Sequence, residues 1–124
     1  MLPLNPDNLL NFSNADVDLL LAALYDFTEA DFSAIWNKKR CRENRKIAFQ
    51  IIRKLESRET NLHDGEIKLI YVSLCFFEEY LVELRDGNQL ASEQESILHL
   101  LPYMQERFAA IMEHHGIVQP DRNG

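Results

Sequence analysis

Two pairs of residues in the C-terminal third of the sequence have types and spacings that could support chemistry. Arg107 and His114 stand seven positions apart. An arginine can stabilise the extra negative charge on a phosphate under attack, and a histidine can move a proton near neutral pH. Glu95 and His99 stand four positions apart, which would place both side chains on one helical face, as two metal ligands can lie. We therefore take Arg107 and His114 as catalytic candidates and Glu95 and His99 as metal-binding candidates.

The spacing of Arg107 and His114 is R-x6-H within a stretch of helical periodicity. It resembles the R-x4-6-H signature of the HEPN family of small helical ribonucleases. The resemblance implies that Arg107 and His114 would act together on the scissile phosphate of an RNA. One feature departs from the pattern: the family usually has a polar residue after the arginine, where this chain has Phe108. The spacing also occurs twice, because Arg58 and His63 fit the same signature. A small ribonuclease or nucleic-acid-binding protein is therefore kept as the alternative function.

Both pairs also have interpretations without chemistry. A histidine in the last turn of a helix interacts favourably with the unpaired carbonyl groups there, which would suit His114. A metal site needs three or four ligands, and no E-x-x-H pair or second histidine nearby completes Glu95 and His99, so they also fit a surface pair. The chain has no Gly-rich phosphate loop, no nucleophile elbow and no H-E-x-x-H motif. The sequence therefore predicts no cofactor and no metal, and it favours a non-enzymatic protein.

Charge is distributed unevenly along the chain. The net charge of the whole chain is −7. Residues 38–58 hold nine lysines and arginines against Glu43 and Glu56, which gives this segment a net charge of +7. The other residues hold four bases against eighteen acids, which gives them a net charge of −14. This basic segment could form ion pairs with acidic helices, bind nucleic acid with Trp36 as a stacking aromatic, or dock another protein. A net-acidic molecule repels a polyanion at long range, so docking of a protein, through the basic segment and/or the acidic helices, is favoured. The expected contact residues are Trp36, Lys38, Lys39, Arg40, Arg42, Arg45, Lys46 and Arg53.

The elements that must position these residues are helices. Four segments, near 14–27, 43–58, 64–86 and 93–115, carry apolar residues at three- and four-residue spacing, and a capping signal precedes the first. A short helix is expected at 29–37, and residues 37–46 fit either a loop or a solvated helix. Short connections make sequential helices antiparallel neighbours. We therefore expect an all-α fold, a compact antiparallel bundle of four to five helices, in a single domain (1–124) with an N-terminal arm (1–12) and a flexible tail (117–124).

The third of these helices is apolar almost all round, because 13 of the residues from 67 to 84 are apolar. Such a helix lies in the middle of a bundle or against a second subunit. In the second case we expect a homodimer through Phe76, Phe77 and Tyr80. Lys68 and three glutamates interrupt the stretch, so we expect no membrane span. Two isolated cysteines and an N-terminus without a secretory signal favour a cytoplasmic protein.

Overall fold

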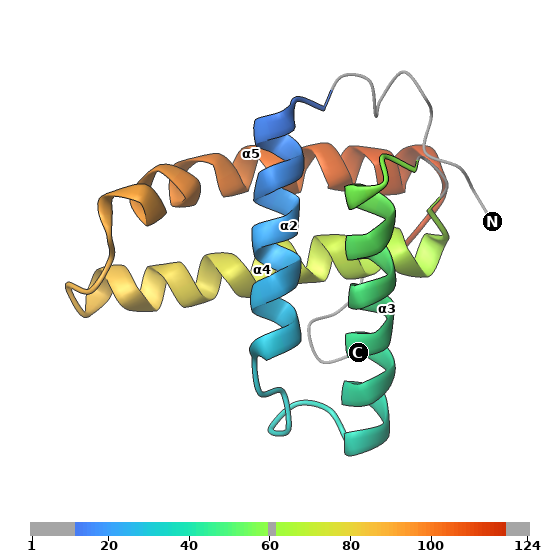
Figure 1. Cartoon of the computed structure of the whole chain (residues 1–124), viewed down its shortest axis with the longest axis horizontal. Helices are drawn as coiled ribbons and strands as arrows, with labels where there is room; N and C mark the ends of the chain where they lie inside the picture. The colour runs from blue at the N-terminus through green and yellow to red at the C-terminus, as the bar shows by residue number, and fades with distance from the viewer. Residues whose placement is uncertain (1–11, 60–61, 119–124) are drawn as a thin grey trace.

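A computed structural model describes residues 12–59 and 62–118. This part of the chain contains four helices and no strand, which confirms the all-α class. The helices are α2 (Asn14–Glu29), α3 (Lys38–Glu56), α4 (Asp64–Asp86) and α5 (Ser92–His114). Together they form a compact helical bundle (Figure 1).

The four helices form two antiparallel hairpins. α2 and α3 run side by side in opposite directions, as do α4 and α5, and the first pair lies across the second (Figure 1). α4 packs against each of the other three helices. This central place explains its apolar circumference, because neighbours cover most of its surface. Of the two positions expected for the third helix, the structure has the one in the middle of the bundle.

The start of α2 is built as its sequence predicts. Ser13 is the N-cap, and its hydroxyl accepts a hydrogen bond from the backbone N–H of Asp16 at 3.1 Å. The Asp16 carboxylate in turn accepts a hydrogen bond from the backbone N–H of Ser13 at 3.0 Å. This reciprocal pair satisfies two backbone donors that a helix start leaves without partners.

Residues 37–46 are mostly helix, which resolves the choice between loop and solvated helix. Asn37 is the N-cap of α3, and its side-chain oxygen accepts a hydrogen bond from the backbone N–H of Arg40 at 2.8 Å. The short helix expected at 29–37 is not present. Instead the carbonyl of Phe32 accepts hydrogen bonds from the backbone N–H groups of Ile35 and Trp36, which closes a turn between α2 and α3.

The left-handed residue that follows α4 is not a glycine. Gly87 has φ of −90°, and the left-handed residue is the next one, Asn88, with φ of 58°. Asparagine takes this role because it tolerates the left-handed region better than most residues with a side chain. After α5 the left-handed residue is a glycine, Gly116, with φ of 71°.

α5 begins one position before the segment 93–115 that the apolar repeat predicts. Its N-cap is Ala91, whose backbone N–H donates to the Gln94 side chain at 2.9 Å. Pro102 lies inside the helix, and α5 continues through it as a single element from Ser92 to His114.

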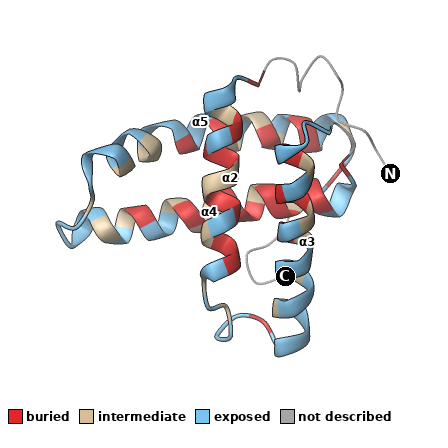
Figure 2. Ribbon diagram, in the orientation of Figure 1, coloured by how far each residue is buried: buried red, intermediate tan, exposed pale blue. Residues whose placement is uncertain are grey.

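The core lies between the two hairpins, where buried residues of all four helices face one another (Figure 2). Phe12, which belongs to the expected arm, is buried, and its ring centroid lies 5.7 Å from that of Phe108. Ile117, which belongs to the expected tail, is also buried, and its backbone N–H donates to the carbonyl of Met112. Phe12 from the expected arm and Ile117 from the expected tail therefore both pack on the core. The rest of the expected arm and tail, 1–11 and 119–124, lies outside the described residues.

The three residues of the expected homodimer face do not share one environment. Phe77 is 7% exposed and belongs to the core, Phe76 is partly buried, and Tyr80 is 43% exposed. Only the outer part of this face is available to a partner while the chain stays folded, and the homodimer stays a prediction. Among the described residues, no helix combines the length and the apolarity that a membrane crossing requires.

Candidate docking surfaces

Arg107, the first catalytic candidate, is engaged by other parts of the fold. Its guanidinium donates a hydrogen bond to the Asp16 carboxylate at 3.0 Å, and its central carbon lies 3.9 Å from the centroid of the Phe12 ring. His114 lies two turns further along the same face of α5, about 10 Å along the helix axis. It is exposed, and its ring centroid is 5.3 Å from that of His115. For Arg107 to act on a phosphate, it would have to leave Asp16 and Phe12.

The partner of Arg107 is held in its ionised form. Burial raises the pKa of Asp16, but the hydrogen bond from the Ser13 backbone, together with the hydrogen bond and the charge of Arg107, outweighs burial and brings the pKa below its usual value. Asp16 thus caps α2 and fixes Arg107 with one carboxylate. This contact joins the start of α2 to α5, which is a structural role.

The metal-binding candidates lie in the open. Glu95 and His99 are both exposed near the start of α5. Within the described ranges, no group of three or more His, Cys, Asp or Glu side chains is placed to hold a metal ion. Both residues lie at exposed positions, and the surface pair that their helical spacing predicts stays a prediction.

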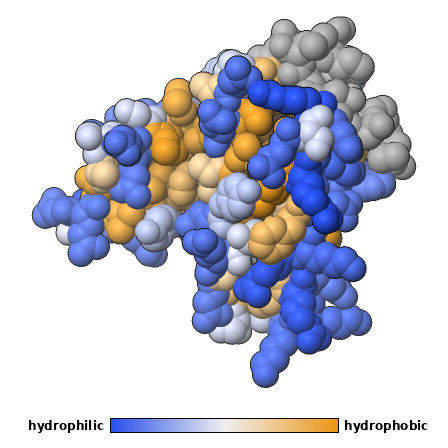
Figure 3. Space-filling view, viewed as in Figure 1, coloured by the Kyte–Doolittle hydropathy of each residue, from blue (hydrophilic) through white to orange (hydrophobic). Residues whose placement is uncertain are grey.

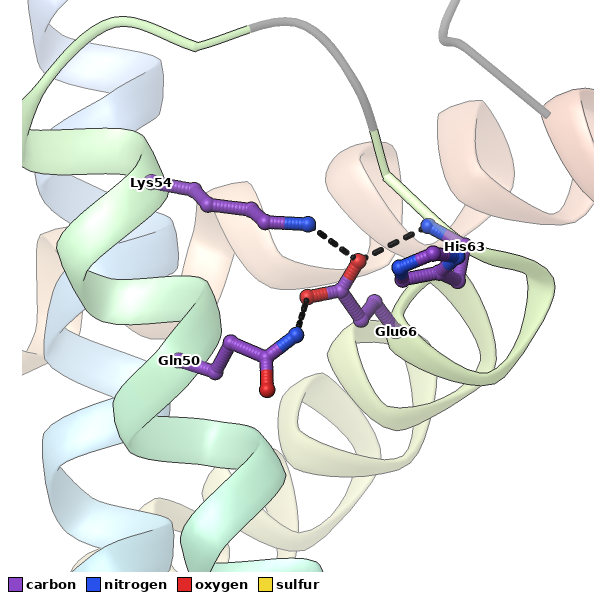
Figure 4. Close-up of polar contacts among 4 residues, drawn as sticks. All are labelled: Gln50, Lys54, His63 and Glu66. Atoms are coloured by element: carbon purple, nitrogen blue, oxygen red, sulfur yellow. Dashed lines mark hydrogen bonds and ion pairs between the residues drawn. The ribbon is translucent and has the colours of Figure 1, made fainter. Parts of the chain in front are cut away.

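One cation of the basic segment is neutralised by a buried acid that the sequence does not single out (Figure 4). Glu66 is 2% exposed, and its carboxylate accepts hydrogen bonds from the Lys54 ammonium at 2.9 Å and from the Gln50 amide at 3.0 Å. A third hydrogen bond comes from the backbone N–H of His63 at 2.8 Å. Three donors make the burial of this charge tolerable, because an unpaired carboxylate in the core would be costly. The cluster joins α3 to the start of α4 and removes the Lys54 charge from the surface.

The other cations of the basic segment lie on the surface. Seven of the predicted contact residues carry a positive charge, and none of them forms an ion pair within the described residues. The basic segment was also expected to form ion pairs with acidic helices, and in the described residues Lys54 is the member of the segment that does so. Hydrophilic side chains accordingly cover the part of the molecule that α3 forms (Figure 3, lower right). The exposed residues are Lys38, Lys39, Arg40, Arg42, Arg45, Lys46 and Arg53.

Trp36, the eighth predicted contact residue, lies in the core. It is 6% exposed, and its ring centroid lies within 6.0 Å of those of Phe27, Phe32 and Phe76. The guanidinium of Arg40 stands over the indole at 5.7 Å from its centroid. In the folded chain, Trp36 therefore anchors the turn before α3 and offers no open ring face for a nucleobase.

The exposed aromatic residue on α3 is Phe49, which the sequence analysis does not identify. It is 46% exposed although its neighbour Ala48 is fully buried. Residues in a helix are about 100° apart, so Phe49 lies in line with a row of cations and opposite the core residue Ile51. The signal is present in the sequence, because position 49 falls outside the apolar repeat 48, 51, 52 and 55. We call this row the cationic stripe: Lys38, Arg42, Arg45, Lys46, Phe49 and Arg53.

A second surface feature lies where the end of α2 and the turn after it meet α4. It is a shallow groove of about 520 Å³ with an apolar floor of Phe32, Ile35, Phe76 and Tyr80, and no lysine or arginine is among its lining residues. Ile35 and Tyr80 are 38% and 43% exposed. We call it the acidic groove, because five carboxylates line it: Asp26, Glu29, Asp31, Glu79 and Glu83.

The carboxylates of the acidic groove do not share one electrostatic environment. Burial raises the pKa of Asp26, and the negative charge of Glu29 raises it further. At the outer side, hydrogen bonds from Ser33 lower the pKa of Asp31, and the charge of Arg45 lowers it further. Asp26 and Glu29 therefore repel each other on the α2 side of the groove, and a cation placed beside them would relieve this repulsion.

No known family model, no curated protein and no solved structure matches the chain. The molecule itself offers two surfaces of opposite charge. One is a convex helical face with an aromatic residue among cations, and the other is a shallow groove with an aromatic floor among carboxylates.

Proposed function

We propose that this protein is a non-enzymatic docking module whose cationic stripe binds an acidic surface of another protein. The observation that carries the proposal is Phe49. It is a half-exposed aromatic residue on a rigid helix, with Arg45 and Lys46 one turn before it and Arg53 one turn after it. Aromatic and arginine side chains dominate the binding energy of protein interfaces when they cluster.

The two parts of the stripe have different tasks in such a contact. Complete burial of a phenylalanine side chain contributes about 1.5–3 kcal/mol, so Phe49 would supply affinity. The cations around it would orient the acidic partner and exclude partners of like charge. Because they have no ion-paired partner in the described part of the chain, no intramolecular ion pair has to break before they engage the partner.

A protein partner fits better than a nucleic acid. Phosphate-driven binding needs an attractive field, and the whole chain carries −7. Single-stranded nucleic acid is also held by successive bases stacked on several aromatic residues. The stripe offers Phe49 alone for this purpose, since Trp36 is buried.

The proposal needs neither metal nor cofactor, and it places the protein in the cytoplasm. Cys41 and Cys75 form no disulfide, as suits a reducing compartment. A ribonuclease that uses Arg107 and His114 is the competing function, and its support is the sequence spacing alone.

Affinity capture with zero-length cross-linking tests the proposal. The tagged chain is incubated with extract of its native cell, and a carbodiimide then joins lysine amines directly to nearby carboxylates. We expect Lys38 or Lys46 to become linked to an acidic peptide of a partner protein. The triple variant Arg42→Glu/Arg45→Glu/Lys46→Glu should lose the partner, and Phe49→Ala should weaken its capture about tenfold or more.

A matched pair of variants controls for net charge. Arg45→Glu and Arg85→Glu change the charge equally, but Arg85 lies at the far end of α4 with a side chain that is 58% exposed. Only Arg45→Glu should weaken capture. Equal losses in both, or submicromolar binding of a single-stranded RNA 20-mer at physiological salt that the triple variant abolishes, would contradict the proposal.

A further inference from the structure

We infer that the acidic groove is a binding site for the cationic stripe of a second copy of this chain. The inference rests on the proposed function, because it names a partner for the stripe. Both halves of the contact are present on one molecule, so the cationic stripe of a second copy can occupy the groove.

The groove has the composition that the stripe requires. Its floor contains exposed apolar surface, chiefly Ile35 and Tyr80, against which the ring of Phe49 can be buried. The carboxylates of Glu29 and Glu83 border this floor from two different helices, α2 and α4. An aromatic anchor in an apolar depression, ringed by opposite charges, combines hydrophobic burial with electrostatic selection.

The charges balance between the two surfaces. The stripe carries five cations around one aromatic ring, and the groove carries five carboxylates around an apolar floor. Burial raises the pKa of Asp26, the negative charge of Glu29 raises it further, and no lysine or arginine is among the lining residues of the groove. Contact with a stripe would bring positive charge close to Asp26 and Glu29.

A contact between the stripe and the groove fits the charges better than a symmetric contact between two α4 helices. The outer part of the expected homodimer face, Phe76 and Tyr80, lies in the groove, while Phe77 is buried. Two copies that met symmetrically there would bring Glu79 and Glu83 of each against those of the other, and like charges across an interface are unfavourable. Docking of a stripe uses the same apolar floor with complementary charges.

The net charge of −7 on each copy does not prevent this contact. At physiological ionic strength, interactions between exposed charges are largely screened beyond about 8 Å, whereas charges in contact interact more strongly. The stripe and the groove are different surfaces, so the contact is heterologous. It closes into a ring or continues into longer assemblies according to the rotation between copies.

Two charge-reversal variants test the inference by sedimentation. Variant Glu29→Lys/Glu83→Lys alters the groove and keeps the stripe, and variant Arg42→Glu/Arg45→Glu alters the stripe and keeps the groove. We expect the wild type to associate at tens of micromolar and each variant alone to associate at least about tenfold more weakly. When the two variants are mixed, the native stripe of one meets the native groove of the other, and association should return.

A control variant and isotopic cross-linking complete the test. Glu106→Lys/Glu113→Lys makes the same change of charge at exposed positions of α5, away from the groove lining, and should associate like the wild type. A mixture of unlabelled and ¹⁵N-labelled chain, treated with carbodiimide, should give cross-links of mixed isotope between Lys46 and Glu83. Circular dichroism of each variant confirms that it is folded.

Three results would overturn the inference: a wild type that stays monomeric at several hundred micromolar, mixed variants that fail to associate, or a control variant as weak as the groove variant. The proposed function has a separate test, which is the capture of a different protein by the stripe. A monomeric chain whose stripe still captures a partner would refute the second copy and leave the docking module standing.

Discussion

The buried pair of Lys54 and Glu66 gives the sharpest prediction of stability, because its two members differ in their access to water. The Glu66 side chain is 3% exposed and that of Lys54 is 16% exposed. In a Lys54→Met variant, the carboxylate stays buried with only the Gln50 amide and the His63 backbone as donors. In a Glu66→Leu variant, the Lys54 ammonium can extend along its flexible stem into solvent.

We therefore expect an unequal cost. Removal of one partner of a buried ion pair destabilises by about 3–5 kcal/mol when the remaining charge is trapped. Lys54→Met should reach this range, at about 4 kcal/mol. Glu66→Leu should cost about 2 kcal/mol, chiefly for the donors left unpaired. The double variant should lose about as much stability as Glu66→Leu, because it also lacks the trapped carboxylate. The coupling energy between the two changes should therefore be about 4 kcal/mol.

Urea denaturation of the four proteins in the cycle measures these values without adding salt. A loss of about 4 kcal/mol lowers the melting temperature of a chain of this size by roughly 15 °C. Lys46→Met is the matched control, because it removes a lysine from an exposed position of the same helix and should change stability by less than about 0.5 kcal/mol. A smaller loss of stability for Lys54→Met than for Glu66→Leu would contradict this prediction, since the trapped carboxylate could then not be the main cost.

Other predictions concern Arg107, Asp26 and two glycines. Arg107→Ala should lower the unfolding free energy by about 1–2 kcal/mol in urea, because it removes a charge-assisted hydrogen bond and packing on Phe12, and any RNA cleavage by the purified chain should survive it. Asp26→Asn should stabilise the chain at pH 7, because the raised pKa of Asp26 means that folding disfavours its ionised carboxyl. This gain in stability should shrink as the pH falls through the pKa of Asp26 in the folded chain, and urea midpoints at pH 7 and pH 4 would show the change. Gly116→Ala should cost about 1 kcal/mol of stability, because φ at this position is +71°. Gly65→Ala should instead stabilise the chain by up to about 1 kcal/mol, because Gly65 lies in the first turn of α4 with open space around it. Thermal melts of both variants check this contrast.

Much of the fold was predictable because the apolar repeats are long and uninterrupted. The four helices follow from repeats such as the one that begins at Val17, and the central place of α4 follows from its apolar circumference. The ends of the helices were predicted less well, because a polar side chain that can begin a helix can equally stabilise a turn. A short helix was expected at 29–37, but within this range the Asp31 carboxylate accepts a hydrogen bond from the backbone N–H of Ser33 and stabilises a turn.

The surfaces were predictable only in part. The sum of charges over residues 38–58 indicated a basic face, but the sum could not separate Lys54, which faces inward, from Arg53, which faces outward. The acidic groove combines residues about fifty positions apart in sequence, such as Glu29 and Glu79, so no local pattern announces it. Its existence depends on how α2 crosses α4, which is a tertiary property.

The inward and outward cations of α3 have one physical cause. Gln50 and Lys54 lie one turn apart on the side of α3 that meets the start of α4, and both donate to Glu66. Together with the core contacts of Ile51 and Leu55, this fixes the rotation of α3 about its own axis. The opposite side must then face solvent, and that side carries Arg42, Lys46, Phe49 and Arg53. The same buried carboxylate that removes the Lys54 charge from the surface therefore helps to hold the five cations of the stripe and Phe49 in a single row, which is the arrangement on which the proposed docking function depends.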